Sequence, residues 1–201
     1  MISADALTRR FGDRDVLRGL DLRIGAGERV ALRGPNGSGK TTALRCVLGT
    51  LTPTGGSITV GTHPAGSIEA RRLIGASLSQ ERSFYLRLSG RENLLFYARL
   101  RDLGKRDGAR AVSELEQELE LEEILAKRVD RCSTGMVQQL AFARALLCDP
   151  ELLLLDEPTR SLDHAAVERL WAAIERRPAL ALVIATHSEA DASRCGEVRD
   201  L

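Results

Sequence analysis

Residues 34–41 read GPNGSGKT, which matches the pattern G-x-x-x-x-G-K-[ST] of a phosphate-binding loop. The apolar residues 30–32 before this stretch predict a β-strand. After it, apolar residues recur at helical spacing over residues 44–48, and Gly49 is typical of a helix C-cap. A glycine-rich loop that joins a strand to a helix is the context in which this motif binds phosphate groups.

The residue types of the loop explain how it holds phosphates. Glycines let the backbone approach closely, so that successive N–H groups and the helix N-terminus point at phosphate oxygens. Lys40 offers a positive charge to the β- and γ-phosphates, and Thr41 offers a hydroxyl to Mg²⁺. The ordered context disfavours a purely structural turn, but the loop alone leaves GTPases, kinases and ATPases open. The expected phosphate-binding residues are Gly34, Pro35, Asn36, Gly37, Ser38, Gly39, Lys40, Thr41 and Thr42.

A second motif, LLLLDEP at residues 152–158, predicts an apolar strand that ends in two carboxylates. It delivers Asp156 and Glu157 at the carboxyl end of the strand, the edge at which open α/β sheets bind ligands. Asp156 is suited to hold Mg²⁺, directly or through water. Glu157 has the opposite side-chain direction along a strand and is expected to be the general base for an attacking water. An acidic pair that only caps the next helix is the less favoured alternative.

The remaining patterns predict an α/β fold with a P-loop NTPase core, a mainly parallel sheet, an N-terminal antiparallel β portion and an inserted helical lobe. Apolar residues fall at three- and four-residue intervals over residues 91–147, with breaks expected at Gly104 and Gly108. The expected strands cover residues 20–24, 30–32, 58–60, 73–78, 152–155 and 180–185, and turns are expected at 25–27 and 53–56.

We expect one domain over the whole chain, with a core lobe formed by residues 1–82 and 149–201 and a helical lobe formed by residues 83–148. Within the helical lobe, the acidic stretch SELEQELELEE at 113–123 places two leucines one turn apart and glutamates on the other side. It is interpreted as a solvated helix face, with an acidic binding surface as the alternative. The glutamates of that face are Glu114, Glu118 and Glu122.

The composition sets limits on the partners. The 201-residue chain has a formal net charge of +1, which disfavours nucleic-acid binding but leaves room for a local basic patch. Four scattered cysteines lack metal-binding spacing and are read as reduced thiols. No apolar run reaches the ~20 residues of a membrane span, and the start lacks the apolar segment of a signal peptide. Any membrane work is therefore expected of a partner chain.

Taken together, the motifs resemble those of the ATP-binding cassettes of ABC transporters, over essentially the whole chain. They follow the order of that family, and seven motifs in sequence are hard to attribute to chance. They are Phe11, GPNGSGKT at 34–41, Gln80, CSTGM at 132–136, LLLLDEP at 152–158, SLD at 161–163, and His187.

The resemblance implies that two cassettes form a head-to-tail dimer, as a homodimer or a heterodimer, with ATP bound between them. Ser133 and the backbone of Gly135 then contact the γ-phosphate held by the other copy, and Asp163 communicates between the two sites. Without the resemblance, Ser133 and Asp163 would each be read as a helix N-cap, and both readings can hold together.

The resemblance also assigns roles within one copy. Phe11 stacks on adenine, Gln80 senses Mg²⁺ and the attacking water, and His187 contacts the γ-phosphate and helps to arrange Glu157. The implied catalytic residues are Glu157, His187, Gln80 and Lys40, the implied Mg²⁺ ligands are Thr41, Gln80 and Asp156, and the implied cofactors are ATP and Mg²⁺. Alone, Gln80 is an uninformative surface residue, and a histidine at a strand end is common.

The implied partner is a membrane permease that docks near residues 80–95, which places the chain in the cytoplasm, peripheral to the inner face of the cell membrane. Apolar contacts with the permease are expected from Phe84, Tyr85 and Leu88, whereas Phe96 and Tyr97 are expected to pack into the core. The signature region most resembles subfamilies that pair with small export-type permeases.

Two alternatives stay open. A soluble ABC ATPase of DNA repair or translation is disfavoured, because such proteins generally carry a coiled-coil insertion or two cassettes. A degenerate cassette that binds ATP without hydrolysing it is disfavoured by the catalytic residues but kept open by Thr134. The sequence departs from common family residues at Thr134, Val137, Gln139, Arg160, Ser161 and His164, and it stops at Leu201 inside an expected strand, which we interpret as a minimal cassette.

Overall fold

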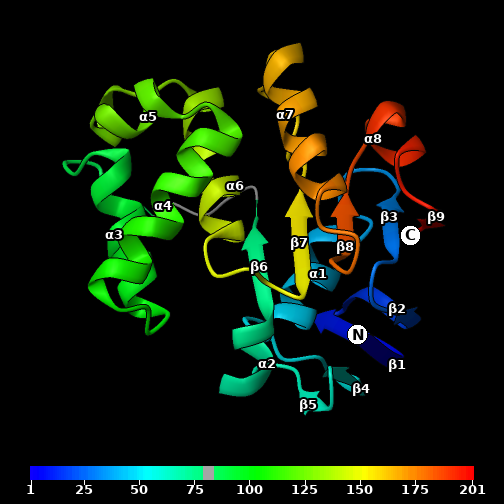
Figure 1. Cartoon of the computed structure of the whole chain (residues 1–201). Helices are drawn as coiled ribbons and strands as arrows, with labels where there is room; N and C mark the ends of the chain where they lie inside the picture. The colour runs from blue at the N-terminus through cyan, green and yellow to red at the C-terminus, as the bar shows by residue number, and fades with distance from the viewer. Residues whose placement is uncertain (79–83) are drawn as a thin grey trace.

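The computed structural model describes residues 1–78 and 84–201, which form a parallel sheet, an antiparallel sheet and the helices that cover them (Figure 1). The parallel sheet consists of β3 (Arg29–Arg33), β6 (Ile74–Ser77), β7 (Leu152–Asp156), β8 (Ala181–Ala185) and β9 (Glu197–Asp200), in the order β6-β7-β8-β3-β9. The antiparallel sheet consists of β1 (Ile2–Phe11), β2 (Arg14–Ile24), β4 (Gly55–Val60) and β5 (His63–Pro64), in the order β2-β1-β4-β5.

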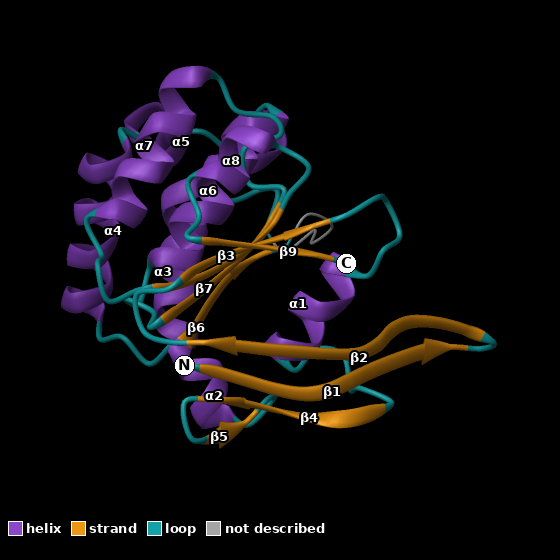
Figure 2. Cartoon of the chain, turned by 90° about the vertical axis from the view of Figure 1, so that its right-hand side faces the viewer, coloured by secondary structure: helices purple, strands orange, loops and turns teal. Residues whose placement is uncertain are grey.

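The helices divide between the two faces of the parallel sheet. They are α1 (Lys40–Leu48), α2 (Ile68–Leu73), α3 (Gly90–Leu100), α4 (Lys105–Leu119), α5 (Glu122–Ala126), a short 3₁₀ helix (Val129–Arg131), α6 (Thr134–Leu146), α7 (His164–Glu175) and α8 (Glu189–Ser193). Figure 2 shows α1 between the two sheets, with α4, α6 and α7 on the opposite side of the parallel sheet. This arrangement confirms the predicted α/β P-loop NTPase fold with its antiparallel N-terminal portion.

The central strands follow from their apolar runs. Every residue of β7 and β8 is buried, because layers cover both faces of the sheet. Leu153 and Leu155 belong to the core shared with the helices, whereas Leu152 and Leu154 belong to the core shared with α1 and the antiparallel sheet. Alternate residues of one strand thus bind two layers together. The burial of each of these four leucine side chains contributes roughly 1.5–3 kcal/mol to the stability of the folded protein.

Helix α6 lies against β6 at a very short distance. A Cβ atom added at Gly75 would lie 1.9 Å from the carbonyl oxygen of Ala145. Only a glycine therefore lets this part of α6 approach the sheet so closely.

Three local expectations are wrong. Gly108 lies buried inside α4 and packs against Ala98 instead of breaking the helix. Gly55 and Gly56 already belong to β4 and not to the turn before it. Glu118 is not on a solvated face, because its side chain is 18% exposed and bonds the guanidinium groups of Arg177 (2.7 and 2.8 Å) and Arg176 (3.0 Å).

The Glu118 cluster joins α4 to the end of α7. Hydrogen bonds from Arg177, and then from Arg176, hold the pKa of the Glu118 carboxyl below its usual range, against the raising effect of its partial burial.

The expected division into a core lobe and a helical lobe stays a prediction. Of the helices in residues 1–78 and 84–201, none has both the length and the apolar content that crossing a bilayer requires.

We predict that Gly75→Ala destabilises the protein by about 2–3 kcal/mol, because the new methyl group forces α6 away from β6. Gly196→Ala is the matched control: its added Cβ meets no atom closer than 3.9 Å, so its effect should stay within about 0.5 kcal/mol. Urea denaturation followed by circular dichroism measures both. Equal stabilities of the two variants would contradict the close packing of α6.

Candidate active site

A cavity of about 430 Å³ opens at the carboxyl edge of the parallel sheet, where the loops after β3, β7 and β8 meet. Its position agrees with the edge at which open α/β sheets bind ligands. The residues that line it are Arg14, Val16, Asn36, Gly37, Gly39, Lys40, Thr41, Thr42, Asp156, Glu157, Arg160 and His187.

Lys40 carries a positive charge into this cavity from the first residue of α1. The residue is only 6% exposed, and its ammonium donates to the carbonyl oxygens of Gly34 (2.6 Å) and Pro35 (3.1 Å). Nε2 of His187 lies 3.3 Å from the same nitrogen. Among the residues that the structure describes, no carboxylate forms an ion pair with Lys40. The loop thus presents a buried cation whose partners are dipoles, and such a site favours an anionic ligand.

The glycines of the loop are required by its backbone. Gly37 and Gly39 have φ values of 81° and 109°, in the left-handed region that favours glycine. A Cβ at Gly39 would also lie 2.9 Å from Cδ2 of Leu17 and 3.0 Å from the carbonyl oxygen of Val16. The glycine-rich sequence therefore lets the start of α1 approach both the cavity and strand β2.

Thr41 and Asp156 meet although 115 positions separate them in the sequence. The Thr41 hydroxyl donates a 2.8 Å hydrogen bond to Oδ2 of Asp156, the last residue of β7. A hydroxyl and a buried carboxylate are hard oxygen donors, and Mg²⁺ commonly uses one or two carboxylates together with substrate phosphates. No cluster of three or more His, Cys, Asp or Glu side chains suited to a metal occurs in the described parts of the chain. The donor set therefore fits Mg²⁺ that is held jointly with a phosphate group.

Glu157 reaches the cavity by a different route from the one predicted. Strand β7 ends at Asp156, and Glu157 adopts φ 50° while its N–H donates to the carbonyl oxygen of Ala185 at 2.8 Å. Strand alternation therefore does not aim its carboxylate; a turn with left-handed backbone does. Oε1 is buried and forms no hydrogen bond with described residues, which leaves it able to accept one from water.

His187 completes the cluster from the loop after β8. Its Nε2 lies 3.4 Å from Oε1 of Glu157 and 2.9 Å from Oδ1 of Asn36, and its backbone N–H lies 3.4 Å from Oε2 of Glu157. This nitrogen faces acceptors on Glu157 and Asn36 as well as the donor Lys40, so its tautomer decides which neighbour it satisfies. Lys40, Glu157 and His187 thus converge on one point of the cavity.

Of the predicted residues that the structure describes, seven lie outside this cavity lining, and they are Gly34, Pro35 and Ser38 of the loop, Phe11, Ser133, Gly135 and Asp163. Ser133 and Asp163 are exposed N-caps that accept hydrogen bonds from the N–H groups of Met136 (3.2 Å) and Ala166 (2.8 Å). A Cβ at Gly135 would lie 2.4 Å from the carbonyl oxygen of Ser161, so packing alone already requires glycine there.

Phe11 is 46% exposed at the end of β1, and the Arg9 guanidinium carbon lies 4.4 Å from the centre of its ring. One face of the ring is therefore covered by a cation. Gln80 lies outside the described residues.

Sequence reasoning missed a buried carboxylate, Asp191, that braces the turns of the site. Asp191 is 2% exposed and accepts hydrogen bonds from Thr159 Oγ1 (2.5 Å), Trp171 Nε1 (3.1 Å) and Thr186 Oγ1 (3.4 Å). Thr159 lies two residues after Glu157, and Thr186 directly precedes His187. The only signal in the sequence was an aspartate in the helical segment after a strand, which does not identify such a network. Arg14, Val16 and Arg160 were likewise not predicted to line the cavity.

The combination of a phosphate loop at the edge of a parallel sheet with a strand-end aspartate defines a P-loop nucleotide-binding domain. More specifically, the chain belongs to the ABC transporter family, because the family model described as ABC transporter matches residues 17–160.

Individual relatives agree with this assignment. The chain is 40% identical over 172 residues to the Nod factor export ATP-binding protein I of Rhizobium meliloti (strain 1021), which covers 85% of this chain and 51% of the relative. It is 37% identical over 171 residues to the daunorubicin resistance ATP-binding protein DrrA3 of Streptomyces coeruleorubidus, covering 85% and 54%. The chain thus spans about half the length of these relatives.

Among solved structures, the dimeric post-hydrolysis state of the ATP-binding cassette MJ0796, bound to ADP and Pi, has a TM-score of 0.90 to this chain at 25% identity. The match covers 100% of this chain and 94% of the other. The fold of the described residues is therefore that of an ATP-binding cassette.

We predict that Asp191→Ala destabilises the protein by about 2–4 kcal/mol, because it leaves the Trp171 indole N–H and two threonine hydroxyls without their buried acceptor. Glu189→Ala is the matched control in the same short helix, since the Glu189 side chain is 86% exposed. Chemical denaturation monitored by Trp171 fluorescence measures both variants. An Asp191→Ala protein as stable as the control would refute the bracing role.

Proposed function

We propose that the chain binds and hydrolyses ATP with Mg²⁺, as one half of a head-to-tail dimer of cassettes, and thereby powers a separate membrane permease. The observation that carries this proposal is the convergence of the Lys40 ammonium, the Glu157 carboxylate and the His187 imidazole in a cavity lined by a phosphate loop. Membership of the ABC transporter family and the names of the relatives support the same function.

The proposed chemistry assigns one task to each group. Lys40 and the N–H groups of the loop hold the β- and γ-phosphates, and Thr41 and Asp156 would hold Mg²⁺, which neutralises charge on the phosphate oxygens when it is bound. Glu157 accepts a proton from the water that attacks the γ-phosphorus, and the bond from that phosphorus to the bridging oxygen breaks to release ADP and phosphate. His187 orients the terminal phosphate beside Glu157. Gln80 is proposed to act in the same site as a Mg²⁺ and water sensor.

A second copy is needed for the remaining predicted residues. Ser133, Gly135 and Asp163 do not line the cavity of their own chain, and Ser133 and Asp163 lie exposed at the starts of α6 and α7. The dimeric form of the similar cassette MJ0796 supports a partner copy that brings such residues to the bound nucleotide. We propose the same dimer here, with Phe11 on the adenine ring.

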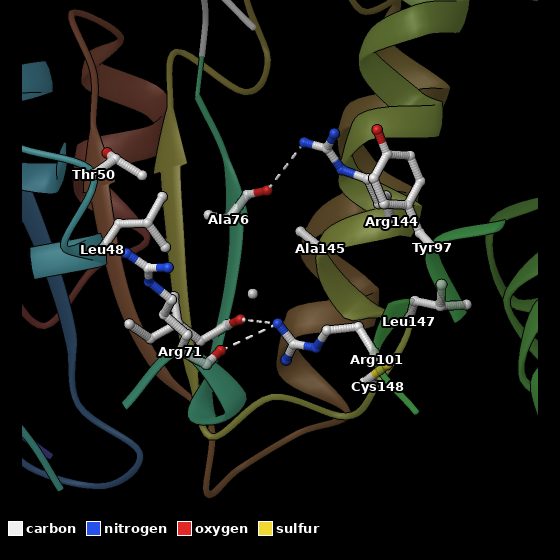
Figure 3. Close-up of a pocket in the computed structure, with 12 residues that line it drawn as sticks. Leu48, Thr50, Arg71, Ala76, Tyr97, Arg101, Arg144, Ala145, Leu147 and Cys148 are labelled. Carbon is white, nitrogen blue, oxygen red and sulfur yellow. Dashed lines mark hydrogen bonds between the residues drawn. The ribbon is translucent and has the colours of Figure 1, made fainter. Parts of the chain in front are cut away.

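The proposed docking region for the permease is the segment near residues 80–95. A second cavity, of about 320 Å³, lies close to this segment and is lined by Tyr97 of α3 and by residues of β6 and α6 (Figure 3). Figure 3 shows Arg101, the residue that follows α3, reaching toward the backbone at Arg71, and Arg144 of α6 reaching toward the carbonyl of Ala76. The wall of the cavity thus joins helices α3 and α6 to the parallel sheet.

Exposed apolar side chains lie just before α3. Tyr85 and Leu86 are 52% and 60% exposed, whereas Phe84 is half-buried against Tyr97, with ring centres 6.0 Å apart. Leu88 is also only partly exposed. Among the residues expected to meet the permease, Tyr85 is therefore the most accessible, and Leu86 extends the apolar surface. The export and resistance named for the relatives support an export-type permease.

We predict that Glu157→Gln accumulates ATP-dependent dimers, because the amide keeps the shape of the side chain but cannot take the proton that turnover requires. Light scattering after size-exclusion chromatography with and without ATP measures the mass. Lys40→Ala should form no such dimers, since it loses a main phosphate contact. A Glu157→Gln protein that stays monomeric at high concentration with saturating ATP would count against the dimer.

We predict that the tagged chain co-purifies from membranes with an integral protein that has about six apolar segments of ~20 residues each. The double substitution Tyr85→Asp with Leu86→Asp should reduce this recovery strongly without weakening ATP binding, because it places charge on the apolar surface before α3. Val198→Asp, at an exposed apolar position on β9, is the control and should keep the recovery. Equal recovery with all three proteins would refute the docking site.

A further inference from the structure

Arg160 lines the cavity in which Lys40, Glu157 and His187 converge. Its backbone N–H donates to the carbonyl oxygen of Glu157 at 3.3 Å, which closes the turn that follows β7. The residue is exposed and lines the same cavity as Lys40 and His187. The turn that aims the Glu157 carboxylate therefore also brings a guanidinium to the cavity wall.

The Arg160 guanidinium has no protein partner among the described residues, since no hydrogen bond or ion pair of its side chain occurs there. The other cations of the wall are engaged: Arg14 donates to the carbonyl oxygen of Gly37 at 3.3 Å, and Lys40 donates to two carbonyls of the loop. An arginine that lines a cavity without a partner has all five N–H donors available to a ligand.

The charge of the wall points to an anionic ligand near Arg160. Arg14, Lys40 and Arg160 provide three positive charges, and Asp156 and Glu157 provide two negative ones. The Asp156 carboxylate accepts a hydrogen bond from Thr41, on the side suited to Mg²⁺. Without Arg160 the charges of these side chains would balance, whereas with it the wall keeps one unbalanced positive charge.

We propose that Arg160 binds the terminal phosphate of the nucleoside triphosphate held in its own chain, so that it distinguishes a triphosphate from a diphosphate and stabilises charge during phosphoryl transfer. This inference rests on the proposed ATP site. Glu157 and His187 converge where the terminal phosphate is expected, and Arg160 belongs to the same four-residue turn as Glu157. A guanidinium presents two parallel N–H donors to phosphate oxygens, and such charge-assisted bonds are among the strongest that proteins make.

The first experiment compares affinities for the β,γ-imido analogue of ATP and for ADP, each with Mg²⁺, by titration calorimetry of dilute protein. Arg160→Ala should weaken binding of the triphosphate analogue about tenfold and binding of ADP less than about twofold, as expected for loss of one charge-assisted contact. Arg160→Lys should keep most of the preference because it keeps the charge. Arg106→Ala, on the exposed start of α4, is the control for net charge and should change neither affinity.

The second experiment measures steady-state hydrolysis by the same proteins. Arg160→Ala should lower kcat by roughly 10- to 100-fold, and Arg160→Lys should restore only part of it, because an arginine directed at the transferring phosphate acts mainly in the transition state. Thermal unfolding should be unchanged in both variants, since no hydrogen bond or ion pair joins the Arg160 side chain to residues 1–78 or 84–201.

The outcomes separate this proposal from the function on which it rests. If the unsubstituted chain binds neither nucleotide, the ATP site itself is wrong. If it binds and hydrolyses ATP while Arg160→Ala leaves the ratio of the two affinities unchanged, the role of Arg160 is overturned and the ATP site stands. An effect that appears only at concentrations where dimers form also overturns the proposal, because it assigns Arg160 to the partner copy's nucleotide.

Discussion

The buried ammonium of Lys40 is the constraint on which the site depends. A cation that is 6% exposed must be compensated, and here the compensation comes from the carbonyl oxygens of Gly34 and Pro35 in its own loop. Those dipoles fix the curvature of the loop, and the curvature in turn requires glycine at Gly37 and Gly39. Because dipoles leave the net charge in place, the folded protein keeps a positive charge at the cavity, and this charge favours an anionic ligand.

The parallel sheet supplies the rest of the site by placing strand ends side by side. Strands β7 and β8 are buried at every residue, so the hydrophobic core holds them in register, and the turns after them emerge at one edge. Asp191 then ties the two turns together through Thr159 and Thr186. A single buried carboxylate thus connects the segment that carries Glu157 to the segment that carries His187. A displacement of either turn would stretch its hydrogen bond to Asp191, so each turn restrains the other.

The sequence was sufficient for features set by local pattern and insufficient for those set by tertiary contact. The strand, glycine loop and helix around Lys40 follow from periodicity and motif, as does Asp156 at the end of β7. Glu157 has a left-handed backbone and donates its N–H to Ala185 on a neighbouring strand, and no local pattern contains either feature. The carboxylates of Asp191 and Glu118 likewise accept hydrogen bonds from side chains far away in the sequence, Trp171 and Arg177 respectively. The roles proposed for Ser133, Gly135 and Asp163 require a second copy, and they therefore stay predictions.

The close approach of Gly75 to Ala145 fixes the position of one end of helix α6. Its C-terminal end is pinned to β6, whereas Ser133 stands at the opposite end, about 18 Å away by helix rise. That opposite end is held as well, because a Cβ atom at Gly135 would lie 2.4 Å from the carbonyl oxygen of Ser161. Two glycines far apart in the sequence therefore fix the position of α6 between β6 and the turn before α7, and with it the place at which Ser133 is presented.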